Sequence, residues 1–209
     1  MLTPRRNASP TSLRAEAERA GKVRIIGGSL RNSRLPVLDR AGLRPTPDRV
    51  RETVFNWLAP TLAGARCLDL YAGSGALGIE ALSRGAAWVE LVESERDLAD
   101  NLREQLTRLQ VADRSQVRAM PCDAFLRDAP AQPFAVVFLD PPYAAEVWSR
   151  GLTALTAAAW LRPGALVYLE WPHPERPKLP EAMTWWREAR AGAVGYGLAR
   201  TANAANGFK

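Results

Sequence analysis

The tetrapeptide Asp140-Pro141-Pro142-Tyr143 combines residue types that suit one particular reaction. A carboxylate and a proline carbonyl side by side can accept both hydrogens of an aromatic amine. The amine lone pair, otherwise delocalised into the ring, then turns out of plane and can attack a methyl group. Each proline fixes its own φ and restricts the residue before it, while a tyrosine ring can stack on an extruded base. The segment therefore predicts methylation of an exocyclic base amine, with all four residues in the catalytic site.

A glycine-rich turn lies upstream of this tetrapeptide, in Asp69-Leu-Tyr-Ala-Gly73-Ser74-Gly75, and extends to Gly78 in a GxGxxG pattern. Glycines let the backbone approach a ligand closely and adopt turn dihedrals that a Cβ forbids. Glu93, at the tip of the next predicted strand, can accept hydrogen bonds from both hydroxyls of a ribose. By itself this pattern suits a nicotinamide cofactor as well as S-adenosylmethionine.

Two further carboxylates favour the sulfonium cofactor. Asp69 lies near the end of a buried strand, where a charge is costly unless a cation such as the methionine ammonium group is near. Asp123, after a later strand, can accept a hydrogen bond from the adenine amino group. Because parallel strands end at the same sheet edge, these acids line one crevice. The residues predicted to bind S-adenosyl-L-methionine are Asp69, Gly73, Ser74, Gly75, Glu93, Asp123 and Ala124.

The elements that must position these residues alternate along the chain. Strands are predicted at residues 23–26, 67–71, 88–92, 116–120, 134–139, 165–170, 185–190 and 194–199, and helices at 76–83, 98–109 and 147–161. An earlier helix starts with Thr46 as its N-cap and Pro47 as its first residue, and it ends at Pro60. The order predicts an α/β fold: a Rossmann-like, mostly parallel sheet of seven strands whose edge is an antiparallel hairpin.

Charged residues are unevenly distributed along the chain. Residues 1–51 hold twelve Arg and Lys against four Asp and Glu, whereas residues 52–209 hold sixteen against eighteen. A basic end on a slightly acidic body indicates a polyanionic partner, although a merely solvated arginine-rich surface is the alternative. We expect a flexible tail at 1–20, a basic extension with a hairpin or loop and a helix at 21–59, and a methyltransferase domain at 60–209.

Composition limits the remaining classes of protein. The only cysteines, Cys67 and Cys122, offer neither a disulfide framework nor a CxxC metal motif, so no metal is expected. No apolar run approaches the ~20 residues of a membrane span, and the N-terminal arginines are not followed by the apolar core of a secretory signal. These features predict a cytoplasmic protein.

Further segments carry a family resemblance. Arg24-Ile-Ile-Gly-Gly28, Leu35-Pro36 and the run from Gly42 to Leu58 (GLRPTPDRVRETVFNWL), together with the turn and the tetrapeptide, resemble the bacterial RsmD family of class I methyltransferases. The resemblance covers about residues 22–200, and the family usually has a second Thr where Pro47 stands. It implies that the protein forms N2-methylguanine in 16S ribosomal RNA, acting as a monomer on naked 16S rRNA or on a 30S assembly particle.

The resemblance gives the basic extension an RNA partner. Arginines that neutralise phosphates would hold that RNA, and those in the basic segment are Arg24, Arg31, Arg34, Arg44, Arg49 and Arg51. The target position comes only from the resemblance, because the tetrapeptide chemistry suits guanine N2, adenine N6 and cytosine N4 equally.

Three alternatives stay open at this point. A DNA adenine-N6 methyltransferase uses the same tetrapeptide but usually carries a larger target-recognition region, whereas only about 60 residues precede the predicted core here. A nicotinamide oxidoreductase needs a residue that handles the hydride, and the only histidine, His173, lies in a proline-rich segment. A catalytically silent RNA-binding protein would have no need of both an intact tetrapeptide and the glycine turn.

Overall fold

The computed structural model describes residues 21–38, 46–141 and 145–203, without the side chains of residues 145 and 146. Its strands are β1 Lys22–Arg24, β2 Arg34–Pro36, β3 Arg66–Asp69, β4 Trp88–Glu93, β5 Ser115–Ala119, β6 Phe134–Leu139, β7 Leu161–Pro172, β8 Met183–Ala191 and β9 Val194–Thr201. Its helices are α2 Asp48–Leu62, α3 Ala76–Ser83, α4 Arg96–Arg108, the short α5 Cys122–Phe125 and α6 Ala145–Ala157, with a 3-10 turn at Ala112–Arg114.

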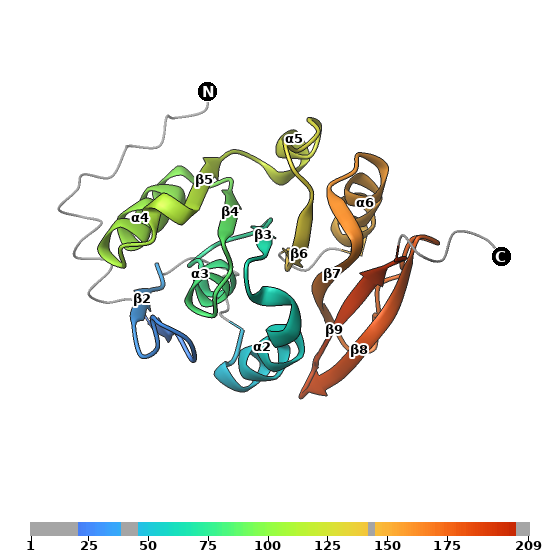
Figure 1. Ribbon diagram of the computed structural model, residues 1–209. Coiled ribbons are helices and arrows are strands. Elements are labelled where there is room, and N and C mark those ends of the chain that lie inside the picture. The colour runs from blue at the N-terminus through green and yellow to red at the C-terminus, as the bar shows by residue number, and fades with distance from the viewer. Residues whose placement is uncertain (1–20, 39–45, 142–144, 204–209) are drawn as a thin grey trace, which may run out of the picture.

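Seven strands form one sheet in the order β5-β4-β3-β6-β7-β9-β8. The first five of these run parallel, and β9 pairs antiparallel with both β7 and β8. Figure 1 shows the β8–β9 hairpin at one end of the sheet and β5 with α4 at the other. The predicted Rossmann-like, mostly parallel sheet with an antiparallel edge is thus confirmed.

Helices cover both faces of this sheet, and side chains of successive residues in β6 alternate between them. Val136 and Phe138 belong to the core that packs under α2, α3 and α4, whereas Val137 and Leu139 belong to the core under α5 and α6. Every residue of β6 is buried because the strand lies inside a sheet covered on both sides. This alternation also decides the face on which the residue after β6, Asp140, projects.

A buried carboxylate is the hub of the polar contacts between the basic extension and the body. Glu80 of α3 is fully buried and accepts hydrogen bonds from the backbone N–H groups of Ile26 (2.7 Å) and Gly27 (2.8 Å) and from Arg84 Nε (2.7 Å). Ser83 Oγ adds a hydrogen bond from the backbone N–H of Leu30 at 2.9 Å. The β1–β2 hairpin is therefore held against α3 by specific polar contacts.

Two predictions about the first described helix were wrong. Thr46 is not an N-cap: α2 begins at Asp48 with Pro47 in the cap position, and the Thr46 hydroxyl instead donates to Glu170 Oε1 at 2.7 Å. Pro60 does not end the helix, which continues to Leu62. A proline in the last turn costs one backbone hydrogen bond, and the buried Leu62 side chain offsets that loss in the core.

The other predicted elements differ from the structure mainly at their ends. The predicted segments 76–83 and 134–139 coincide with α3 and β6, whereas β7 is twelve residues long and extends beyond the predicted 165–170 in both directions. Asp123, predicted only to follow a strand, lies in the short helix α5. The predicted tail 1–20 lies outside the described residues. No helix in the described parts of the chain is long and apolar enough to cross a membrane.

Candidate active site

The glycine-rich turn joins the end of β3 to the start of α3. Gly73 and Gly75 have φ of 51° and 77°, in the left-handed region that side chains rarely adopt. A Cβ on Gly75 would also stand 2.6 Å from Leu102 Cδ2. The turn is thus shaped by its glycines, and it brings the N-terminus of α3 to the sheet edge where parallel strands end.

Glu93, the last residue of β4, holds the turn in place. Its Oε2 accepts a hydrogen bond from the Gly73 N–H and its Oε1 accepts one from the Glu95 N–H, both at 2.9 Å. Each carboxylate oxygen has two acceptor sites, so these contacts leave capacity for ribose hydroxyls. Ser74, also predicted to bind the cofactor, is a buried residue between the two glycines.

Asp69 ends the central strand β3 and is almost fully buried, with 2% of its surface exposed. Its Oδ2 accepts a hydrogen bond from the Gly78 N–H at 3.0 Å, where a Cβ on residue 78 would lie only 3.2 Å away. Burial raises the pKa of this carboxyl to about 7, although the hydrogen bond from Gly78 opposes the rise. Asp69 therefore carries a charge that the free protein stabilises poorly.

Asp123 lies on the surface at the start of α5, and Ala124 follows it half-buried. The Asp123 Oδ2 pairs with Arg150 Nη2 of α6 at 3.3 Å, with more than half of each side chain exposed. Beside it, burial raises the pKa of Cys122 to about 11, just as burial raises that of Cys67 to about 12. Neither thiol is a thiolate nucleophile at neutral pH.

Asp140 directly follows β6, and the next residue, Pro141, is buried. Leu139 pairs with Leu169, so the parallel register places Asp140 beside Glu170 of the neighbouring strand β7. Burial raises the pKa of Asp140 well above its ordinary value, and the nearby Glu170 and Asp69 carboxylates raise it further. Pro142 and Tyr143 lie outside the described residues.

Glu170 is the residue of this site that the sequence analysis did not identify. It is 4% exposed, and its Oε1 accepts hydrogen bonds from the Tyr168 hydroxyl at 2.5 Å and the Thr46 hydroxyl at 2.7 Å. An acid inside an apolar strand is the one sequence signal for Glu170. Its partner Thr46 lies 124 residues away in sequence, so the pairing could not be predicted. The three acids thus lie on three adjacent strands: Asp69 ends β3, Asp140 follows β6, and Glu170 lies inside β7, two residues before its end.

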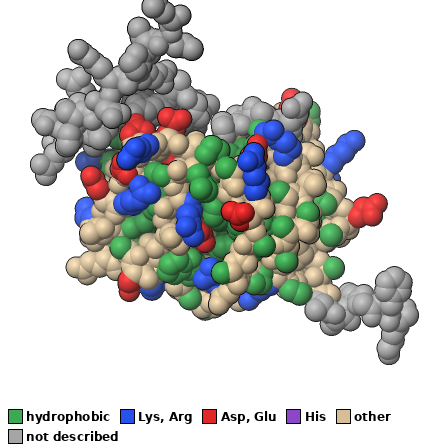
Figure 2. Space-filling view, turned by 90° about the horizontal axis from the view of Figure 1, so that it is seen from above, with side chains coloured by type: hydrophobic (Ala, Val, Ile, Leu, Met, Phe, Trp, Pro, Cys, Tyr) green, Lys and Arg blue, Asp and Glu red, His purple; other side chains and the backbone are tan. Residues whose placement is uncertain are grey.

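The arginines of the basic extension do not share one environment. Arg31, Arg34 and Arg49 are exposed, and so is Arg24, which pairs with Asp48 at 3.1 Å. Arg44 lies outside the described residues. Figure 2 shows several Lys and Arg side chains on one face of the molecule, with hydrophobic side chains between them.

Arg51 requires a correction, because it was predicted to contact RNA and is fully buried. Its Nη2 donates to Asp48 Oδ1 and to the Arg24 carbonyl, both at 2.7 Å, and its Nη1 lies 3.8 Å from Glu80 Oε2. A guanidinium enclosed by these partners cannot reach a phosphate. Arg51 instead links α2 to the β1–β2 hairpin and α3.

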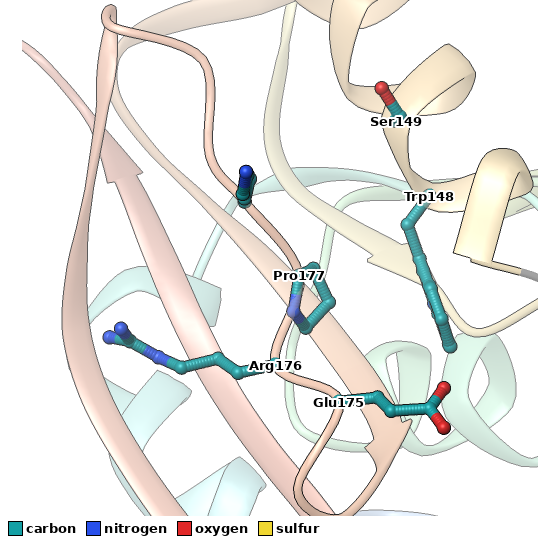
Figure 3. Close-up of a pocket in the computed structure, with 6 residues that line it drawn as sticks. Trp148, Ser149, Glu175, Arg176 and Pro177 are labelled. Atoms are coloured by element: carbon teal, nitrogen blue, oxygen red, sulfur yellow. The ribbon is translucent and has the colours of Figure 1, made fainter.

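A surface pocket of ≈ 350 Å³ lies between α6 and the segment after β7. It is lined by Trp148, Ser149, Glu175, Arg176, Pro177 and Lys178. Figure 3 shows Pro177 and Glu175 beside the Trp148 indole, while Arg176 points away from it. Arg176 is occupied elsewhere, since it forms a two-pronged ion pair with Glu188 at 2.6 Å for each contact.

Comparison with known proteins gives consistent matches over most of the chain. The family model described as conserved hypothetical protein 95 matches residues 23–200. Ribosomal RNA small subunit methyltransferase D of Haemophilus influenzae is 42% identical over 180 residues, which are 85% of this chain and 93% of that protein. The protein of the same name in Escherichia coli K12 is 43% identical over 180 residues, covering 86% and 90% respectively.

Solved structures agree with these sequence matches. The YhhF protein of Escherichia coli superimposes with a TM-score of 0.79 at 41% identity, over 87% of this chain and 99% of that one. An RNA methyltransferase from Salinibacter ruber, solved in complex with S-adenosyl-L-homocysteine, has a TM-score of 0.60 over 76% and 94% of the two chains. At 20% identity, this second likeness concerns the fold alone.

Proposed function

The chain belongs to the RsmD family, and from that premise we propose that it transfers a methyl group from S-adenosyl-L-methionine to the exocyclic N2 amine of a guanine in 16S ribosomal RNA. One observation carries the proposal: Asp140 of the tetrapeptide and the glycine-rich turn after β3 lie at the ends of adjacent parallel strands. A cofactor on the turn and a base at the tetrapeptide would therefore meet at one sheet edge.

The residues of the turn suit the proposed cofactor. Asp69 is a buried carboxylate with no cation among its hydrogen-bond partners in the described part of the chain, and an ammonium group would supply one. Glu93 retains acceptor capacity for ribose hydroxyls, and Asp123 with Ala124 would flank the adenine. When bound, S-adenosylmethionine supplies an electrophilic methyl group next to the base site.

Asp140 and Pro141 would perform the chemistry on the base. Their oxygens would accept the two hydrogens of the guanine amine and turn its lone pair toward the methyl carbon. Asp69 and Glu93 would hold S-adenosylmethionine so that its methyl group could pass to the amine nitrogen, with S-adenosylhomocysteine as the leaving product. The amine proton then passes to the Asp140 carboxylate and from there to water, while Tyr143 would stack on the base.

The exposed arginines of the basic extension would hold the RNA by neutralising phosphates. In this proposal the RNA-contacting set is Arg24, Arg31, Arg34, Arg44 and Arg49, without the buried Arg51. We further propose that the enzyme acts as a cytoplasmic monomer, with residues 60–209 as the methyltransferase domain and 21–59 as the RNA-contacting extension.

Transfer of a labelled methyl group tests the proposal directly. The protein is incubated with labelled S-adenosylmethionine and naked 16S rRNA, 30S particles or DNA, and each product is digested to nucleosides. We expect labelled N2-methylguanosine from one or both RNA substrates and no label in DNA. Labelled N6-methyladenine in DNA would favour the DNA methyltransferase alternative. In calorimetry, tight binding of NAD without binding of S-adenosylmethionine or S-adenosylhomocysteine would favour an oxidoreductase.

A further inference from the structure

Three carboxylates gather on one face of the sheet at the candidate active site. Side chains in a strand alternate between faces, and Cys67, Phe138 and Tyr168 all belong to the core under α2 and α3. The residues two positions later, Asp69, Asp140 and Glu170, therefore project on this same face. They follow the order β3-β6-β7, so Asp140 stands between the other two acids.

The surroundings of Glu170 and Asp140 differ in one decisive way. Glu170 Oε1 receives hydrogen bonds from two hydroxyl groups, those of Tyr168 and Thr46. Such donors favour the ionised form of a buried carboxylate, and they oppose the rise that burial causes in the Glu170 pKa. Glu170 is thereby the better stabilised anion of the pair.

Two carboxylates act on Asp140 among the described residues. Glu170 on β7 and Asp69 on β3 both raise its pKa, and Tyr168 on β7 and Tyr196 on β9 are the other titratable groups of this cluster. Neighbouring parallel strands lie only about 4.8 Å apart, so the charge of Glu170 acts on Asp140 at short range through a buried environment.

On the basis of the proposed function, we propose that Glu170 is a positioning residue: Tyr168 and Thr46 hold its carboxylate beside Asp140 and favour its ionised form, and that charge makes the ionised Asp140 carboxylate a stronger acceptor for the hydrogens of the substrate amine. Glu170 itself does not touch the base in this assignment. Thr46 directly precedes Pro47, the cap of α2. Its hydrogen bond to Glu170 therefore also connects the basic extension to the sheet edge that carries Asp140.

Glu170→Gln isolates the charge, because the amide oxygen can still accept from Tyr168 and Thr46. The titration of Asp140 is followed by carboxyl-carbon NMR in protein labelled at aspartate, with its signal assigned by loss in Asp140→Asn. We expect Glu170→Gln to lower the Asp140 midpoint by about one pH unit. Glu90→Gln is the matched control, because Glu90 is also a buried strand carboxylate but pairs with Arg118 at 2.7 Å. It should leave the midpoint unchanged.

Activity gives a second readout. In Glu170→Gln the acid limb of kcat should move to lower pH in parallel with the NMR midpoint, while the KM for S-adenosylmethionine stays unchanged. If Glu170→Gln fails to fold, the double variant Tyr168→Phe with Thr46→Val replaces it, and a smaller shift in the same direction is expected. An Asp140 midpoint equal to that of wild type in the folded variant would overturn the inference.

Failure of the proposed function is distinguishable from failure of this inference. If wild-type protein methylates none of the nucleic acids offered, the proposed function is wrong. The titration of Asp140 still shows in that case whether Glu170 acts on Asp140. If wild-type protein methylates RNA but Glu170→Gln and Glu90→Gln behave alike, the function stands and the positioning role is wrong.

Discussion

Carboxylates at this sheet edge fulfil different tasks because their surroundings differ. Glu93 accepts two backbone N–H groups and fixes the turn, whereas Asp69 has a pKa of about 7 in place of the ordinary 3.8. A raised acid pKa means that the folded state binds the proton more tightly than the unfolded state. The stability that this proton contributes is present below pH 4 and is lost as the pH rises through 7. A cationic ligand that pairs with ionised Asp69 would offset this loss of stability.

Asp69 should therefore make cofactor affinity depend on pH. Because the ionised form would pair with the ligand ammonium group, we expect wild-type protein to bind S-adenosylmethionine about tenfold more weakly at pH 5.5 than at pH 7.5 in calorimetry. Asp69→Asn should bind more weakly at both values and lose most of this dependence. Equal affinities of wild-type protein at the two pH values would contradict the assignment.

Asp140 should matter for turnover and not for cofactor binding. Asp140→Ala removes the acceptor of the amine hydrogens, so we expect kcat to fall by about 10²–10⁴-fold, the range typical of such proton-handling groups. Calorimetric affinity for S-adenosylmethionine should stay close to that of wild type. Asp113→Ala, which changes an exposed acid in the 3-10 turn, is the control and should retain full activity. Undiminished turnover in Asp140→Ala would remove this residue from the mechanism.

At the scale of elements, the attachment of the β1–β2 hairpin depends on Glu80. Its carboxylate accepts two backbone N–H groups of the hairpin and Arg84 Nε, and it lies 3.8 Å from the buried Arg51. Removing one partner of a buried charge network leaves the others without compensation, which is strongly destabilising. Glu80 is thus a central member of the polar network that couples the hairpin to the body, beside Ser83 and Arg51.

Glu80→Gln should lower the free energy of unfolding by roughly 3–5 kcal/mol, as measured by urea denaturation. The hairpin should also become more sensitive to limited proteolysis, since its backbone N–H groups would lose a charged acceptor. Glu104→Gln, an exposed residue of α4, provides the control and should change stability by less than about 0.5 kcal/mol. If both variants unfold at the same urea concentration, the Glu80 network does not hold the hairpin.

Sequence patterns predicted those elements whose signal is local. Residues 134–139 form an unbroken apolar run, so a central buried strand followed by Asp140 could be predicted and is confirmed. Arg51 was assigned to the surface although it lies three and four residues before Val54 and Phe55, on the buried face of α2. Its partners Glu80 and Arg24 are distant in sequence, so the compensation that permits a buried arginine could not be predicted.

The same limit explains the misassigned Thr46. A threonine before Pro-Asp is typical of an N-cap, whose hydroxyl oxygen accepts a backbone N–H, and the pattern alone gives no reason to expect a different partner. In the folded chain the Thr46 hydroxyl instead donates to Glu170 Oε1, and a hydrogen bond to a carboxylate is stronger than one between two neutral groups. Contacts between the basic extension and the sheet therefore could not be predicted from the sequence.

At the scale of the whole molecule, the net charge of +6 is concentrated toward the N-terminal quarter of the sequence. If this region holds RNA, binding should release counterions and weaken steeply with salt, whereas cofactor binding at the sheet edge should not. Arg31 and Arg34 test this most cleanly, because both side chains are exposed in the hairpin region. Arg24 is less suitable, since it pairs with Asp48.

The double variant Arg31→Ala with Arg34→Ala should weaken binding of 16S rRNA and reduce its salt slope by up to about two phosphate contacts, with S-adenosylmethionine affinity unchanged. Arg187→Ala with Arg190→Ala removes the same charge from exposed positions on β8, at the far end of the sheet. Filter binding over a range of salt concentrations distinguishes RNA binding by the hairpin arginines from a general effect of net charge. An equal loss of slope in both double variants would mean that only net charge matters. An unchanged slope in the hairpin variant would mean that the RNA docks on another surface.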